Sequence, residues 1–186
     1  MDEEIQKPME RVRIEHKERM FFLGHHLGSE VHWFFSQGSE ALERGLILPA
    51  CGSFIIGIES SLRVTMAQLE NPAPVEELDP ARTLSNRLLI DARRAGLPVE
   101  KLAFPGECDF NEKLESAKPS LQSVEIVRVR HNLCHGNILE YINKDFGKNN
   151  HFFTPECCLN LAIQLLIVSK AWVEALGNFR KAMQNA

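Results

Sequence analysis

The sequence predicts an all-α protein, a single domain built as a bundle of about five to six helices. Apolar residues recur at three- to four-residue spacing along most of the chain, which is the spacing of one helical face. Pro and Gly residues separate these periodic segments. With 186 residues, of which 44% are apolar, the chain is long enough for one substantial core and too short for two. The domain is therefore expected to span residues 1–186.

Three helices are expected in the N-terminal half. Residues 3 to about 27 are rich in charge with apolar positions between, which is typical of an amphipathic helix with a solvated outer face. A second helix is expected from Ser29 to Arg44, and a third over residues 53–70. The first half of the third helix is apolar all round, so it should be central and buried. Gly57 inside it indicates close approach of another helix, since Gly costs roughly 1 kcal/mol relative to Ala there.

The next segments combine a short helix with a long connection. A fourth helix is expected over residues 82–95, because Gly96 and Pro98 follow it as stop signals. Residues 97–118 are polar and contain a Pro-Gly pair, so we expect a surface excursion at about 97–118. Long loops in compact domains are often functional.

Two helices are expected in the C-terminal third. Pro119 is suited to the first turn of a helix that runs to about His135, with Gly136 just past its end. Residues 137–150 are expected to be irregular. The last helix should begin at Thr154-Pro155 and run to about residue 183. Its expected core positions are Leu159, Ile163, Leu166, Trp172, Leu176 and Phe179.

Composition limits the partners and the compartment. The net charge of -4 gives no overall attraction for nucleic acid, so RNA binding requires a local basic surface such as residues 80–101. The acidic start of the sequence lacks the pattern of a signal peptide, and no run of eighteen apolar residues indicates a membrane span. Five irregularly spaced cysteines favour reduced thiols. We therefore expect a cytoplasmic protein without membrane contact.

One stretch places ionisable side chains inside an apolar helical pattern. Arg130 projects from the centre of the apolar stripe, and a buried guanidinium is costly unless an anion meets it. Arg128, His131 and His135 share the neighbouring helix face through their i, i+3, i+7 spacing. This group is suited to handling phosphate. The structural alternative is an ion pair, and Glu59 in another apolar helix is a plausible mate for Arg130.

Residues 130–135 read Arg-His-Asn-Leu-Cys-His, which resembles the signature of the HEPN superfamily (higher eukaryotes and prokaryotes nucleotide-binding domains). In that signature an Arg is followed, after four to six residues, by a His, usually with a polar residue next to the Arg. Arg128 and Arg130 both satisfy the spacing to His135. The polar pair His131-Asn132 makes Arg130 the better match.

The resemblance implies a helical bundle, usually dimerised so that the two motif helices line a shared cleft, and in many members a metal-independent endoribonuclease of the toxin or defence kind. His135 would then take the proton of a ribose 2′-hydroxyl, and Arg130 would stabilise charge on the phosphoryl oxygens. In a homodimer the partner's histidine could serve as the acid. The expected product is a 2′,3′-cyclic phosphate, and no cofactor is expected.

Supporting roles fall to the other polar residues of the motif. Asn132 and His131 are secondary candidates; Asn132 could orient His135, bond a phosphate or cap the helix end. Arg128 could contact the RNA backbone or remain a solvated charge. Arg130 and His135 lie about 140° apart on a regular helix, so they converge more easily across a dimer interface than within one chain.

Three alternatives concern regulation, activity and metal. An antitoxin or nucleotidyltransferase partner is possible, although Asn137 stands where some HEPN members carry the Tyr used for antitoxin-mediated modification. The chain could also be a catalytically silent HEPN module that binds RNA, nucleotide or a protein. A zinc site is the third possibility, disfavoured by ligand spacing. It would draw on His131, Cys134 and His135 with Cys157, Cys158 or His151.

Overall fold

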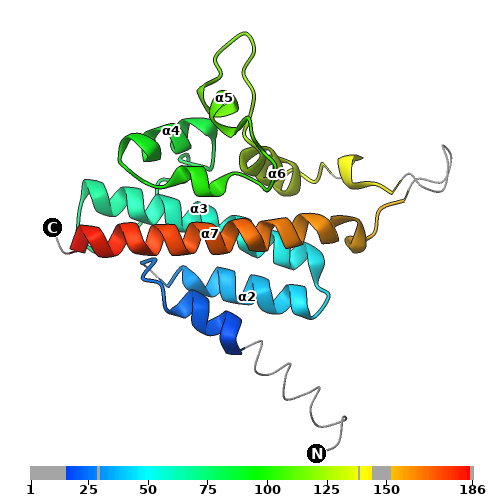
Figure 1. The fold of residues 1–186 in the computed structure, drawn as a ribbon, viewed down its shortest axis with the longest axis horizontal. Coiled ribbons are helices and arrows are strands. Elements are labelled where there is room, and N and C mark those ends of the chain that lie inside the picture. The colour runs from blue at the N-terminus through cyan, green and yellow to red at the C-terminus, as the bar shows by residue number, and fades with distance from the viewer. Residues whose placement is uncertain (1–15, 29, 138, 144–151, 185–186) are drawn as a thin grey trace, which may run out of the picture.

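The computed structural model describes residues 16–28, 30–137, 139–143 and 152–184, and it confirms the all-α prediction (Figure 1). Two long helices, α3 (Ile47–Glu70) and α7 (Leu159–Gln184), lie side by side and run in the same direction. Buried Trp172 donates to Ser61 Oγ at 2.9 Å near their middle. Near their ends Arg180 donates to Thr65 Oγ1 at 3.0 Å. This pair forms the centre of the bundle, as predicted for residues 53–70.

Shorter helices cover the central pair on two sides (Figure 1). The helix of residues 16–23 and α2 (His32–Glu43) lie on one side. On the other side lie α4 (Asn86–Arg94), η1 (Val99–Leu102), α5 (Phe110–Glu115) and α6 (Glu125–Cys134). Residues 3–15 of the first expected helix fall outside the described residues.

Two glycines let α2 and α3 approach closely. A Cβ on Gly57 would come within 2.9 Å of the Phe35 ring, and a Cβ on Gly38 would come equally close to the Phe54 ring. Each aromatic ring therefore fills the space left by the glycine of the facing helix. The close approach inferred for Gly57 is confirmed.

Several helices begin elsewhere than predicted. α3 starts at Ile47 and includes Pro49, which lies in the first turn, where a backbone N–H has no helical partner and its loss costs little. α4 starts at Asn86, where Ser85 Oγ accepts the N–H of Leu88. α6 starts at Glu125, six residues after Pro119.

The expected surface excursion at 97–118 is wrong for most of its length. It contains η1 and α5, and it supplies a row of apolar side chains to the core. The carboxylate of Glu107, 4% exposed, accepts the backbone N–H of Glu125 at 2.7 Å, so this segment also caps α6. The polar residues that suggested a loop alternate with the six that are buried: Leu97, Val99, Leu102, Phe104, Phe110 and Leu114.

After α6 the chain returns to α7 through short turns. η2 (Leu139–Tyr141) replaces the irregular chain expected there, and Asn143 forms an isolated antiparallel bridge with Phe152. η3 (Pro155–Cys158), with Pro155 in its first turn, leads directly into α7. The predicted start of the last helix is therefore confirmed, although its first turn is a 3-10 turn.

The core face of α7 differs in part from the predicted one. Trp172 and Leu176 are fully buried, but Leu159 and Ile163 are each 44% exposed. Leu166 and Phe179 are partly buried. The first half of α7 has two apolar stripes, so periodicity alone did not select the buried one. The buried stripe consists of Leu161, Ala162, Leu165 and Val168.

Two helical stretches, Ile47–Glu70 and Pro155–Gln184, are long and apolar enough to cross a membrane by length and composition. Within the bundle, 56% and 44% of their most apolar windows are buried. Core helices of proteins outside membranes meet the same criterion, so this is weak evidence for a span. The sequence-based expectation of no membrane contact stays a prediction.

Candidate active site at the end of α6

α6 carries every motif residue except His135, which follows its last residue, Cys134, and the helix ends close to the predicted position. Ile126 and Val129 are fully buried and fix its orientation in the bundle. Gly136 has φ +67°, the left-handed conformation that closes many helices, and the N–H of Asn137 donates to the carbonyl of Asn132 at 2.8 Å. His135, between them, is the first residue past the helix and is exposed.

Arg130 connects α6 to the central helix α3. Its Nε donates to Glu59 Oε2 at 3.1 Å, and Arg63 of α3 lies 3.8 Å from the other oxygen of the same carboxylate. The Arg130 and Glu59 side chains are 21% and 12% exposed. The structural mate expected for Arg130 is thus the partner seen in the structure.

Arg128 is held by two carboxylates at the surface. Its Nε and Nη2 form a fork on Glu125, with Nε 2.8 Å from Oε2, and its Nη1 donates to Glu140 of η2. Hydrogen bonds that Arg128 donates, to Glu125 foremost and also to Glu140, raise its pKa, although partial burial opposes them. Arg128 is therefore neither a plain solvated charge nor, in this state, free for RNA.

Asn132 is 7% exposed and holds the second oxygen of Glu140. Its Nδ2 donates to Glu140 Oε1 at 2.7 Å, while its Oδ1 accepts from Asn137 Nδ2 at 3.2 Å. The network fixes which way the amide points. Three roles were considered for Asn132: orienting His135, binding a phosphate and capping the helix end. The observed contact is most like phosphate binding, because Asn132 donates to an anion, the Glu140 carboxylate.

His131 and His135 form an exposed pair on the outer face of α6. Their ring centroids are 4.5 Å apart with an interplanar angle of 46°. Arg128 stands one turn before His131 on the same helix face. The structure therefore groups His135 with His131, whereas Arg130 points to Glu59.

The described residues contain no cluster of three or more metal-ligating side chains. Of the cysteines considered as zinc ligands, Cys134 is exposed and Cys158 is buried. His151 lies outside the described residues. The zinc alternative thus has no assembled ligand set in the described part of the chain.

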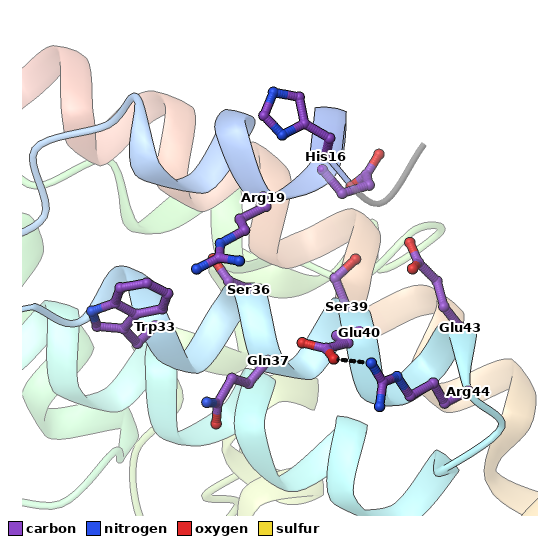
Figure 2. Close-up of a pocket in the computed structure, with 10 residues that line it drawn as sticks. His16, Arg19, Trp33, Ser36, Gln37, Ser39, Glu40, Glu43 and Arg44 are labelled. Carbon is purple, nitrogen blue, oxygen red and sulfur yellow. Dashed lines mark ion pairs between the residues drawn. The ribbon is translucent and has the colours of Figure 1, made fainter. Parts of the chain in front are cut away.

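A separate polar groove of about 410 Å³ lies between the helix of residues 16–23 and α2 (Figure 2). Arg19 lies 5.2 Å from the centroid of the Trp33 ring at one end, and Arg44 pairs with Glu40 at the other. Three carboxylates (Glu18, Glu40 and Glu43) and two guanidinium groups (Arg19 and Arg44) line the groove, so it has no electrostatic preference for phosphate. It is on the opposite side of the α3–α7 pair from α6 (Figure 1).

Sequence reasoning did not identify Glu140, although this residue contacts both Arg128 and Asn132. Glu140 follows the end of α6, so no helical periodicity connects it with the motif. One signal could have found Glu140. A buried amide such as Asn132 requires a hydrogen-bond acceptor, and Glu140 is a carboxylate close to it in the sequence.

Comparisons of the chain with protein-family models, curated proteins and solved structures give no match. The likeness to HEPN proteins consequently stays a resemblance of the sequence motif.

Proposed function

We propose that this protein is a metal-independent endoribonuclease of the HEPN type, which cleaves RNA by attack of a ribose 2′-hydroxyl on the adjacent phosphate. The observation that carries the proposal is the exposed pair His131 and His135, 4.5 Å apart at the end of α6. Histidine exchanges protons between pH 5 and 8 and is the usual general acid and base in such reactions. A pair of histidines within one chain can therefore supply both the general acid and the general base.

The reaction needs no other reagent. His135 takes the proton of the 2′-hydroxyl, the 2′-oxygen bonds to phosphorus, and the bond from phosphorus to the 5′-oxygen breaks. His131 gives a proton to that leaving oxygen. The products are a 2′,3′-cyclic phosphate and a 5′-hydroxyl.

Arg128 is the arginine that this geometry favours for charge stabilisation. It shares the helix face of both histidines, and a guanidinium near the phosphate stabilises the charge that develops on the phosphoryl oxygens. Arg130 then acts as a positioning residue, because its ion pair with Glu59 sets α6 against α3. If two chains dimerise along α6, a partner's histidine replaces His131 as the acid.

The test uses mixed structured and single-stranded RNA in excess EDTA. Wild-type protein is expected to leave cyclic phosphate ends, and His131→Ala and His135→Ala to lose activity about 100-fold or more. His26→Ala is a matched control, because His26 is exposed and lies in the N-terminal part of the chain. Equal cleavage by all variants would reject the site and indicate a contaminating nuclease.

A second candidate function is a catalytically silent module that binds RNA, nucleotide or protein. The observation that favours it is that Arg128 and Arg130 both have carboxylate partners within the chain. A folded wild-type protein that binds RNA in the same assay without cleaving it would support this function. We also propose a cytoplasmic homodimer; an antitoxin or nucleotidyltransferase partner belongs to the same proposal.

A further inference from the structure

We propose that Arg128 and Asn132 form a binding site for one RNA phosphodiester, and that Glu140 occupies this site when RNA is absent. RNA would thus bind by displacing the chain's own carboxylate. The inference rests on the proposed function, because it assigns the phosphate contact of that site and its regulation. It concerns an arrangement that the three residues already show.

The donors match the two non-bridging oxygens of a phosphodiester. Glu140 Oε2 accepts from Arg128 Nη1, and Glu140 Oε1 accepts from Asn132 Nδ2 at 2.7 Å. Each oxygen of one planar anion therefore has its own donor. A phosphodiester presents the same pair of negatively charged acceptors to guanidinium and amide groups.

Both donors have further partners that position them independently of Glu140. The Nε and Nη2 edge of Arg128 stays on Glu125, which belongs to the same helix, and this fork orients the guanidinium. Only 7% of Asn132 is exposed, and its Oδ1 accepts a hydrogen bond from Asn137 Nδ2. Because a buried amide N–H is costly to leave unpaired, the site requires an anion or another acceptor whenever Glu140 moves away.

Glu140 is suited to exchange. Its side chain is 29% exposed and belongs to the three-residue η2, which has no buried residue. An ion pair at such a site contributes only modestly to stability, because water screens the two charges. The position lies beside the histidine face of α6, because Arg128 precedes His131 by one turn. A phosphate there would place neighbouring nucleotides near both imidazoles.

Displacement weakens RNA binding by a calculable route. When a competent site is open in a fraction of molecules, the apparent dissociation constant rises by the inverse of that fraction. Removing the competing carboxylate should therefore tighten binding without adding a contact. It also removes a negative charge that would otherwise repel the RNA backbone.

The experiment measures binding of a fluorescent 2′-O-methyl RNA oligonucleotide by anisotropy at fixed salt. This probe carries phosphodiesters but has no free 2′-hydroxyl, so it cannot be cleaved. Glu140→Gln and Glu140→Ala are both expected to bind about five- to tenfold tighter than wild type. Glu156→Gln is the matched control: Glu156 is an exposed carboxylate of η3, and its loss changes the net charge equally. The control should change affinity less than twofold.

A double variant assigns the gain to the site. Glu140→Gln with Arg128→Ala should bind no tighter than wild type, since the donor that would receive the phosphate is gone. Circular dichroism and thermal unfolding establish that each variant is folded. Unchanged affinity of folded Glu140→Gln and Glu140→Ala would overturn the inference, as would an equal gain in Glu156→Gln.

The two proposals fail separately. Tighter binding by both Glu140 variants, without histidine-dependent cleavage of ordinary RNA by any protein, would retain the phosphate site and reject the ribonuclease. Histidine-dependent cleavage by wild type, with neither affinity nor rate altered in the Glu140 variants, would retain the ribonuclease and reject the exchange.

Discussion

At the scale of single residues, Arg128 and Arg130 are two positions apart and use their charge differently. Arg130 meets Glu59 of a distant helix, and both side chains are largely covered. Arg128 meets Glu125 of its own turn and Glu140 of the following segment, near the surface. Exchange of a carboxylate for a phosphate is cheaper at the exposed position, because water screens the pair that breaks. Arg128 is for this reason the better arginine for a ligand.

The pKa of Glu140 gives a residue-scale prediction. Partial burial would raise this pKa, but the nearby Tyr141, Asn132 and Arg128 side chains outweigh burial and lower it below 4.5. A carboxyl whose pKa is lower in the folded state than in the unfolded one stabilises the fold above the unfolded value. That contribution is lost as the pH falls through the folded value.

Wild-type protein should therefore lose more unfolding free energy than Glu140→Gln as the pH falls below about 4.5. Urea unfolding at half-unit steps from pH 6 to pH 3 measures the difference between the two proteins. The difference in unfolding free energy between wild type and Glu140→Gln should be constant near pH 6 and should shrink as the pH approaches 3. A difference independent of pH would mean that Glu140 is not held as a carboxylate in the fold.

The arrangement of the motif residues could be predicted from the sequence, because the spacing of residues along one helix decides which of them share a face. The spacing of Arg128, His131 and His135 placed them on one face, and the two histidines do contact each other. The same reasoning offered Glu59 as a mate for Arg130 because each interrupts an apolar stripe. Glu140 was out of reach, since its contact with the motif depends on how the chain turns after Gly136.

At the scale of elements, three contacts hold α6 in addition to the buried side chains of Ile126 and Val129. Glu107 of the preceding segment accepts the N–H of Glu125 at its start, Arg130 pairs with Glu59 along its length, and Gly136 turns the chain at its end. The first and the last restrain the helix termini. The middle contact joins α6 to the centre of the bundle, so it should have the largest effect on stability.

Arg130→Met should lower the free energy of unfolding by about 1–3 kcal/mol, because Glu59 keeps a covered charge without its hydrogen-bond donor. Combining it with Glu59→Gln should recover part of the loss. Urea unfolding followed by circular dichroism measures each value. Arg44→Met is the control, since the Arg44–Glu40 pair is exposed and should contribute less than about 0.5 kcal/mol. Equal effects of the two substitutions would show that the Arg130 pair does not anchor α6.

Element boundaries were the weakest sequence predictions, for reasons visible in particular residues. The third helix is predicted to begin at residue 53, yet it begins at Ile47 and includes Pro49, because a proline in the first turn removes a donor that the helix does not use. Pro119 predicts a helix start, but α6 begins only at Glu125, where the Glu107 carboxylate from another segment accepts its first N–H. Tertiary contacts of this kind cannot be read from local spacing.

At the scale of the whole molecule, the parallel pair α3 and α7 separates two different surfaces. One side, with α2, carries the polar groove; the other, with α6, carries the histidines (Figure 1). The all-α class was predictable because every long segment repeats at helical spacing. Family membership was not, since a short Arg-to-His spacing and a helical bundle are shared by many unrelated chains.

An apolar stripe on the outside of the molecule supports a homodimer. Leu159, Ile163 and Ile167 follow one another at four-residue spacing on α7 and are 44%, 44% and 51% exposed. A continuous apolar stripe of this kind on a helix surface often marks an interface. Its position along one face is compatible with an isologous contact, in which the same residues meet their own copies.

The stripe predicts a dimer that one charge disrupts. Sedimentation at micromolar concentration should show wild-type dimer, while Ile163→Glu raises the dissociation constant about tenfold or more, because the twofold axis brings two uncompensated carboxylates into one apolar interface. Asn178→Glu adds the same charge at an exposed position in the second half of α7 and should leave the dimer intact. Monomeric wild-type protein would remove the partner from the proposed mechanism. The acid and the base would then have to come from His131 and His135 of a single chain, which their contact allows.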